Sequence, residues 1–269
     1  MDKIDFSKIA EKYHEISTVQ KSASETLFNL LDIQPEESVL DVGCGPGDLT
    51  FKIKEITGAR VVGIDASEGM IKEAVKNYGY TNIEFLTKNC LDINFDREFD
   101  AIFCNSSFQW FTNIQTIIIN FYKALKPGGR IAIQAPATEL YCPNFVSAIK
   151  KMTDGDEKIR EIYSQFKSPW LFLENAGEYS RIFESGGFKI VLSKIDSQSA
   201  KQMPEKVFEI FSSGAIEGYL NKDNYSIEIG NDYIERFKYL IKQEFVKQAD
   251  KDGLVNLIFN RIYLLASKS

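Results

Sequence analysis

The segment Val39–Asp48 joins an apolar run to three glycines at alternate positions, Gly43, Gly45 and Gly47. Glycine adopts positive φ without steric cost, and it lets a ligand approach the main chain where a Cβ would block it. A strand that runs directly into such a turn and then into a helix is typical of nucleotide-binding α/β proteins. The segment therefore predicts the first strand of a parallel sheet, with a nucleotide-like ligand at the turn that follows.

The spacing of this turn excludes two common nucleotide sites. A Walker-type phosphate loop ends in Gly-Lys-Ser/Thr, whereas the first lysine after the turn is Lys52. A dinucleotide fingerprint has a third glycine where this chain has Asp48, whose charge would repel a pyrophosphate. Asp41 and Asp48 would instead attract a sulfonium cation. The turn therefore favours a cationic nucleoside ligand and argues against a nicotinamide-dependent oxidoreductase.

Polar residues also follow the next three apolar runs. Asp65 lies 22 positions after Gly43, close to the offset of about 20 residues at which an acid binds a ribose diol. The stretch 89–92 follows a third run, and Asn105 with Ser106 ends a fourth. Because parallel strands bind ligands beyond their carboxyl ends, we expect these residues to line one site.

The hydrophobic pattern predicts alternating strands and helices, which favours an α/β fold with right-handed crossovers. The predicted strands are 38–42, 60–64, 83–87, 99–104, 129–135, 188–195 and 258–266, and the predicted helices are 48–57, 68–78, 114–125 and 176–185. We expect one domain over residues 1–269. Its parts are an N-terminal helical cap (1–34), a cofactor-binding core (35–136), two cover insertions (137–174 and 197–255) and a last sheet strand (258–267).

The ordered motifs LDVGCGPG, VVGIDAS, NCLDI, FDAIFCNSSFQWF and LKPGGRIAIQAP resemble the class I S-adenosylmethionine-dependent methyltransferases over about residues 35–136. The NSSFQWF run, Gln134-Ala-Pro136 and the C-terminal 259–268 are similar to the trans-aconitate and malonyl-carrier-protein O-methyltransferase group. The resemblance implies a Rossmann-like, seven-stranded, mostly parallel sheet with helices on both faces, an antiparallel last strand and a helical cover. It also implies S-adenosylmethionine as cofactor and S-adenosylhomocysteine as product.

Roles for the cofactor-binding residues follow from this resemblance. Asp41 would orient the ammonium group and Asp65 the ribose hydroxyls. Asp92 and the amide of Leu91 would read the adenine, while Met70 either packs against the adenine or belongs to the core. Asn105 and Ser106 would face the methionine part. The full set of expected cofactor residues is Asp41, Gly43, Gly45, Gly47, Asp65, Ala66, Met70, Leu91, Asp92, Asn105 and Ser106.

The methyl acceptor is less clearly indicated. A carboxylate is already ionised at neutral pH, whereas an amine or hydroxyl usually needs a general base. His14, the single histidine, is the base candidate beside Tyr13; an exposed histidine without a role is the alternative. The expected acceptor-binding residues are Tyr13, Gln20, Gln109, Trp110, Gln134 and Trp170, with Lys150, Lys167 or Arg181 as possible cations. Phe108, Trp110 and Phe111 either anchor the next helix or form a wall of the acceptor pocket.

Charge and composition narrow the class of partner. A net charge of −6 argues against nucleic acid. The four cysteines form no C-x-x-C pair and His14 is the only histidine, which argues against a zinc site, and we expect no metal. The sequence shows neither a long apolar stretch nor a secretion signal, so we expect a cytoplasmic protein. We also expect a monomer or weak homodimer. The predicted function is methyl transfer to a carboxylate oxygen of a small-molecule or carrier-linked acid. N- or C-methylation and non-catalytic cofactor binding remain alternatives.

Overall fold

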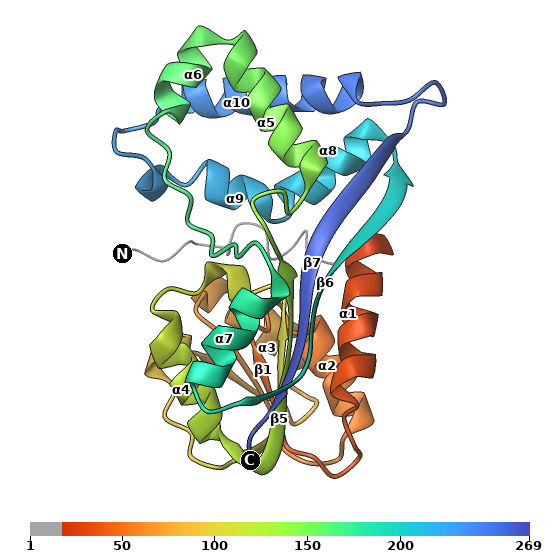
Figure 1. Cartoon of the computed structure of the whole chain (residues 1–269), viewed down its shortest axis with the longest axis vertical. Helices are drawn as coiled ribbons and strands as arrows, with labels where there is room; N and C mark the ends of the chain where they lie inside the picture. Colours follow the sequence, from red (N-terminus) through yellow and green to blue (C-terminus); the bar gives the residue numbers. More distant parts are fainter. Residues whose placement is uncertain (1–17) are drawn as a thin grey trace.

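The computed structural model describes residues 18–269, and side chains from residue 22 onward. A seven-stranded sheet in the order β3-β2-β1-β4-β5-β7-β6 forms the lower part of the molecule in Figure 1. The strands are β1 (Val39–Val42), β2 (Val61–Asp65), β3 (Glu84–Thr87), β4 (Phe99–Asn105), β5 (Leu125–Pro136), β6 (Lys189–Gln202) and β7 (Val255–Ser267). The first five pair in parallel, and β7 is antiparallel to both β5 and β6. The predicted fold class is confirmed.

The register of the central strands brings their carboxyl ends to one edge. Val42 at the end of β1 is opposite Ile64 in β2, and Asn105 at the end of β4 is opposite Gln134 in β5. All four residues of β1 are buried, as expected for a strand covered on both faces. The turns that follow β1, β2 and β4 therefore lie next to one another.

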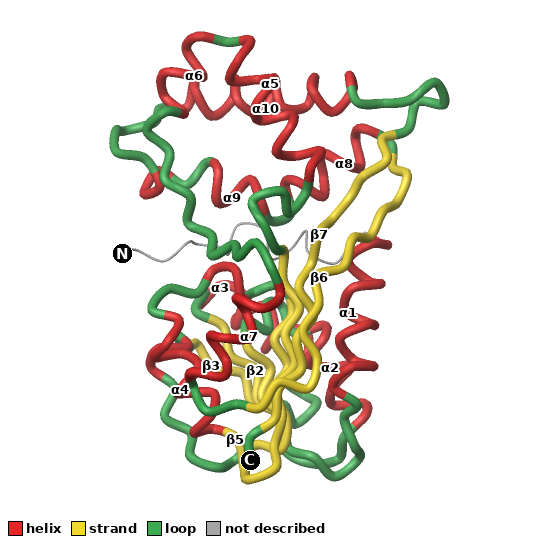
Figure 2. The backbone as a smooth tube through the Cα atoms, in the orientation of Figure 1, coloured by secondary structure: helices red, strands yellow, loops and turns green. Residues whose placement is uncertain are grey.

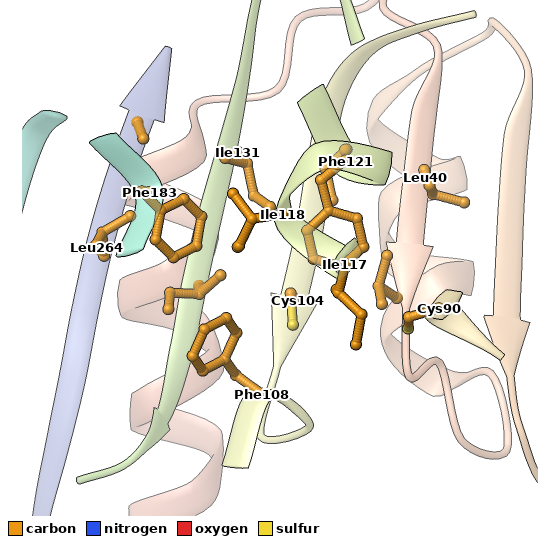
Figure 3. Packing of buried hydrophobic residues seen from close by; sticks show 14 of the residues in the cluster. Leu40, Cys90, Cys104, Phe108, Ile117, Ile118, Phe121, Ile131, Phe183 and Leu264 are labelled. Carbon is orange, nitrogen blue, oxygen red and sulfur yellow. The ribbon is translucent and has the colours of Figure 1, made fainter. Parts of the chain in front are cut away.

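Helices cover both faces of the sheet. The first face carries α1 (Thr18–Leu31), α2 (Asp48–Ile56) and α3 (Glu68–Tyr78), whose apolar side chains share a cluster with alternate residues of β1, β2 and β4. The other face carries α4 (Ile114–Ala124) and α7 (Ala176–Ser185). Ile118 and Phe121 of α4 pack in one cluster with Leu40 and Ile131 of the sheet and with Phe183 of α7 (Figure 3). Their spacing places one apolar stripe of α4 against the sheet.

Five helices form a cover above the carboxyl edge of the sheet. They are α5 (Pro143–Gly155), α6 (Glu157–Tyr163), α8 (Pro204–Ser212), α9 (Ala215–Tyr219) and α10 (Asn231–Lys247). They enclose a third apolar cluster, which includes Phe259 at the start of β7. Figure 2 shows β6 and β7 extending past the other strands toward this cover. The hairpin thus connects the cover to the sheet.

Two strand boundaries differ from those predicted. β6 continues to Gln202 instead of ending at Ile195, because residues 196–202 pair with 255–261 of β7. Its second half is polar, so it lacks the apolar run from which a strand was predicted, and the range expected for the second cover insertion begins inside the strand. β5 begins at Leu125, and a register shift opposite Phe99 and Ala101 accommodates the predicted turn at 126–129.

Within residues 18–269, none of the helices combines the length and the apolar character needed to cross a lipid bilayer. The same part of the chain contains no group of three His, Cys, Asp or Glu side chains that could hold a metal ion. The division into cap, core and cover remains a prediction, and residues 1–17 of the cap lie outside the described residues.

Candidate active site

A cavity of about 750 Å³ lies at the carboxyl edge of the sheet. Its floor is made by residues that end or follow β1, β2, β3 and β4, namely Gly43, Asp65, Ala66, Ser67, Asn89 and Ser107. The cover contributes Pro169 and the continuous segment 221–228. Cavities at this edge of an open parallel sheet are the usual ligand sites of such folds. The cavity therefore lies at the ends of β1 to β4. Of the residues expected there, Gly43, Asp65 and Ala66 are on the described lining, whereas Gly45, Gly47, Asn105 and Ser106 are not.

The glycine turn adopts the predicted backbone, since Gly43, Gly45 and Gly47 have φ of 73°, 55° and 92°. A Cβ on Gly43 would lie 2.4 Å from the Cβ of Ser107. A Cβ on Gly45 would meet no atom within 4 Å. Gly43 is thus required by the close approach of the turn after β4, while Gly45 leaves open space in which a ligand can contact the main chain.

The Asp65 carboxylate holds the turns after β1 and β2 together. Its Oδ2 accepts from the Gly45 N–H at 3.0 Å, and its Oδ1 accepts from the Ser67 N–H at 2.8 Å. Burial raises the pKa of Asp65, and the backbone N–H donors oppose that shift. Each carboxylate oxygen has a further lone pair, so Asp65 can still accept from two ribose hydroxyls. Asp65 lines the cavity, and its ribose role stays a prediction.

The other two acids of the glycine segment do not line the described cavity. Asp41 is 2% exposed and accepts from Thr50 Oγ1 at 2.7 Å. Burial raises the pKa of Asp41 to about 7, and the nearby charge of Asp65 adds to the shift. Asp48 accepts from the Tyr78 hydroxyl at 2.8 Å, which joins α2 to α3. The Asp48 charge thus serves a contact between helices, not the ligand side of the turn.

The pKa of Asp41 predicts a pH dependence of stability. A folded-state pKa near 7, against 3.8 ordinarily, means that the folded protein keeps this proton when the unfolded chain has lost it. The free energy of unfolding should therefore fall as the pH rises from about 4 to 7. Asp41→Asn, which can still accept from Thr50, should lose part of this slope in urea unfolding at pH 5 and pH 8. Glu55→Gln, at an exposed position of α2, is the control. An unchanged slope in Asp41→Asn would contradict the assignment.

On the side where the adenine is expected, the residues that line the cavity lie slightly earlier in the sequence than those predicted. Asn89 and Cys90 line it, whereas Leu91 and Asp92 are not among the described lining residues. The Leu91 N–H donates to Asn89 Oδ1 at 2.9 Å, and the Asp92 N–H donates to the Asn89 carbonyl, also at 2.9 Å. Both amides are used inside the short helix 90–92. Met70, in the first turn of α3, is only 3% exposed. This burial favours the second of its two expected roles, a core residue, over packing against the adenine.

The turn after β4 is held by buried amide side chains. Ser106 has φ of 56°, an unusual conformation for a residue other than glycine. Gln109 Nε2 donates to the Ser106 carbonyl at 2.8 Å, and Gln109 is 6% exposed. Gln134 is fully buried and bonds to Asn105 and Ser106. Neither glutamine lines the described cavity, and both donate within the protein, so their expected role as donors to the methyl acceptor stays a prediction.

The aromatic residues after β4 have different roles, since one anchors the turn and two others line the cavity. Phe108 is fully buried against Phe183, with ring centroids 5.8 Å apart, and so anchors the turn. Trp110 and Phe111 line the cavity. Trp170 lies behind this wall, with its ring centroid 5.6 Å from that of Trp110.

The segment 221–228 was not identified from the sequence, although its Asn-Lys-Asp-Asn start is rich in turn formers. It is bonded to the chain before Trp170: the Lys167 N–H donates to the Asn224 carbonyl at 2.7 Å, and the Ser226 N–H to the Gln165 carbonyl at 3.1 Å. Lys222 is exposed on the cavity lining. Lys150, one of the cations expected to pair with the acceptor, forms an ion pair with Asp154 on the outer surface of the cover.

Three predicted residues cannot be placed at the cavity. Tyr13 and His14 lie outside the described residues. Gln20 falls in the first turn of α1, and its side chain is outside the description.

An open sheet with this strand order, a glycine turn after β1 and an acid after β2 defines the class of Rossmann-like ligand-binding α/β proteins. The sequence profile of the family described as a methyltransferase domain matches residues 33–187, more than half of the chain. The chain therefore belongs to the methyltransferase-domain family. The methyltransferase class expected from the sequence is confirmed.

Three similar proteins are named for different methyl acceptors. The chain is 33% identical over 130 residues to a malonyl-[acyl-carrier protein] O-methyltransferase of Priestia megaterium, covering 47% of each chain. It is 27% identical over 128 residues to a trans-aconitate 2-methyltransferase of Deinococcus radiodurans, covering 47% of this chain and 48% of the relative. It is 25% identical over 220 residues to a phosphoethanolamine N-methyltransferase of Triticum aestivum, covering 81% of this chain and 39% of the relative. The matched part is thus about half or less of each relative's length.

Solved structures support the fold. The YcgJ protein of Bacillus subtilis matches with a TM-score of 0.60 at 14% identity, covering 92% of this chain and 98% of that one. The phosphoethanolamine N-methyltransferase 2 of Haemonchus contortus, solved with phosphomonomethylethanolamine and S-adenosylhomocysteine, matches with a TM-score of 0.53 at 18% identity. That match covers 92% of this chain and 52% of the other.

Proposed function

We propose that this protein transfers a methyl group from S-adenosylmethionine to a carboxylate oxygen of a small or carrier-linked acid. The open main chain at Gly45 and the Asp65 carboxylate provide a place for the nucleoside, and the family is one of methyltransferases. In a methyl transfer of this kind, the acceptor oxygen attacks the methyl carbon as the carbon–sulfur bond breaks, which leaves S-adenosylhomocysteine. The protein's part is to align the two reactants and exclude water.

The observation that carries the acceptor class is the chemistry of the cavity lining. Burial raises the pKa of Cys90 well above its ordinary range, and it raises the pKa of Tyr225 as well. Neither side chain is a base at neutral pH, and the described lining contains no histidine. Its cover carboxylates, Asp223 and Glu228, are exposed to solvent, where a carboxylate is a weak base. A carboxylate acceptor needs no proton removed, because it is ionised at neutral pH. The lining therefore suits a carboxylate better than an amine or hydroxyl.

Amine methylation is the second candidate, since the wheat relative matched over 81% of this chain is an N-methyltransferase. The nature of the product separates the two. Labelled S-adenosylmethionine should be offered with free di- and tricarboxylic acids, malonyl groups on acyl-carrier protein, and primary amines. We expect label that alkali releases as methanol, as from a methyl ester, and a rate that is nearly constant from pH 6 to 8. Label that resists alkali, with a rate rising over that range, would point to an amine. Absence of transfer to every class, with the cofactor bound, would favour a non-catalytic binder.

Lys222 is the cover lysine placed to attract an anionic acceptor. Lys222→Ala should raise the acceptor KM about three- to tenfold while kcat changes little, because an exposed ion pair contributes about 0.2–1 kcal/mol and a more enclosed one contributes more. Lys251→Ala is the matched control, since Lys251 is exposed in the turn between α10 and β7 and is not on the cavity lining. Initial rates against acceptor concentration test this. An equal KM for the two variants would remove Lys222 from the proposal.

A further inference from the structure

A buried arginine lies between the cover and the turn after β4. Arg261 of β7 is 3% exposed, and its guanidinium carbon lies 4.8 Å from the centroid of the Phe259 ring. Phe259 packs edge-on against Phe145 of α5, with ring centroids 5.7 Å apart. Arg261 therefore adjoins the apolar core of the cover on one side. Burial of an arginine is costly unless its donors are used, so its partners are informative.

On its other side, Arg261 orients the amide of Gln134. Arg261 Nη1 donates to Gln134 Oε1 at 2.7 Å, and the Ala135 N–H donates to the same oxygen at 3.2 Å. The opposite orientation would turn the amide nitrogen toward these two donors, so the donors decide which way the amide lies. As a result, Gln134 Nε2 donates to Asn105 Oδ1 and to Ser106 Oγ, both at 2.9 Å.

These bonds help to hold Ser106 in its left-handed conformation. A conformation of this kind is strained for a residue other than glycine and persists only where the surroundings impose it. Here the Ser106 N–H donates to the Gln134 carbonyl at 2.7 Å, and the Ser106 carbonyl accepts from Gln109 at 2.8 Å. The Gln134 amide adds the third contact, through the hydroxyl. Ser106 is thus held at three points by two buried glutamines.

The next residue carries this arrangement to the cavity. Ser107 Oγ donates to the Val42 carbonyl at 2.9 Å, and the Ser107 side chain occupies the space that a Cβ on Gly43 would need. Ser107 and Gly43 both line the cavity. A change in the backbone at Ser106 would therefore move Ser107 against the glycine turn.

We propose that Arg261 is a positioning residue for cofactor binding: it orients the Gln134 amide, which holds the turn 105–107 against the glycine turn at the cavity floor. This proposal depends on the methyltransferase fold and not on the identity of the acceptor. In this proposal, a residue of the last strand, far from the cofactor-binding motifs in sequence, acts on the site through Gln134.

The test measures S-adenosylhomocysteine affinity by calorimetry, which needs no acceptor. Gln134→Glu keeps the shape of the side chain and can still accept from Arg261, but it cannot donate to Asn105. We expect this variant to bind at least tenfold more weakly with its fold retained, as judged by circular dichroism. A purely packing role for Gln134 would leave the affinity unchanged, and that result would overturn the proposal.

The coupling between the two residues is tested with Arg261→Met, Gln134→Met and the double variant. If Arg261 acts through Gln134, the double variant should bind no more weakly than the weaker single variant, whereas additive losses would contradict the proposal. Arg261→Lys can still donate to Gln134 Oε1, so it should bind more tightly than Arg261→Met. It also replaces Arg261→Met in the test if that variant does not fold. If Arg261→Lys bound as weakly as Gln134→Glu, the result would count against the proposal. Arg130→Met is the matched control. Arg130 precedes Gln134 by four residues in β5 and donates to the Leu31 carbonyl and to Glu37, so its loss should lower stability without changing the affinity.

Discussion

Gly43→Ala is expected to destabilise the protein by about 3 kcal/mol, because it adds the cost of a left-handed conformation, about 1–2 kcal/mol, to that of overpacking, about 1–3 kcal/mol. Gly43 has φ of 73°, and a Cβ there would lie 2.4 Å from the Cβ and 2.6 Å from the Oγ of Ser107. The collision would displace the turn after β4 at the cavity floor, so S-adenosylhomocysteine binding should weaken as well. Urea unfolding measures the first effect and calorimetry the second.

Two further variants separate strain from collision. Gly128→Ala has a comparable φ of 76°, but an added Cβ would meet no atom within 4 Å, so it should cost only the conformational part, about 1–2 kcal/mol. Adding Ser107→Gly to Gly43→Ala removes the colliding atoms and should recover at least about 1 kcal/mol of the overpacking cost. If Gly43→Ala is no more destabilising than Gly128→Ala, the close approach of the two turns is not what requires glycine.

Asp65→Ala is expected to weaken S-adenosylmethionine binding at least tenfold, or about 1.4 kcal/mol, while the fold is retained. The carboxylate has two functions in this expectation. It accepts from the Gly45 and Ser67 N–H groups at 3.0 and 2.8 Å, and, as a residue of the cavity lining, it has further lone pairs that can accept from the ribose hydroxyls. Alanine removes both, so the glycine turn loses a bond at the point where the ligand is expected to contact it. Calorimetric titration with the cofactor and with its demethylated product checks the result.

Asp100→Ala is a matched control for this variant. Asp100 lies near the amino end of β4, where it accepts from Ser38 and pairs with Lys126 at 2.7 Å. Its loss should lower stability and leave the cofactor affinity of the folded protein unchanged. Asp65→Asn keeps one acceptor oxygen and should lose less affinity than Asp65→Ala. Equal affinities for Asp65→Ala and the wild-type protein would refute the ribose assignment.

The core of the fold was predictable because its signals are local. The apolar runs of β1, β2 and β4 and the glycines after β1 specify strands buried on both faces and a turn with positive φ. Asp65 was predictable at the cavity for the same reason, since the carboxyl end of a parallel strand already gives its location. The second half of β6 was missed because it is polar, and its pairing partners lie about 60 residues away in β7.

The roles of Gln134, Gln109 and Leu91 could not be read from sequence. Each has an N–H group that the sequence offers to a ligand, and each donates to a neighbour instead: Gln134 to Asn105 and Ser106, Gln109 to Ser106, and Leu91 to Asn89. Whether a polar group bonds to a ligand or to a neighbouring residue depends on the distance between adjacent turns, and a few ångströms decide it. A cytoplasmic location and a monomeric or weakly dimeric state remain predictions from composition.

The sequence alone determined the sheet, the glycine turn and the methyltransferase class, because these follow from hydrophobic period, backbone freedom and the order of motifs within about 100 consecutive residues. Only the tertiary structure decided what covers the cavity and what holds its floor. The segment 221–228 and Arg261 come from the far end of the chain, and nothing in their local sequence shows that they meet the turns after β1 and β4. Long-range packing of the β6–β7 hairpin places them there, since that hairpin joins the cover to the sheet.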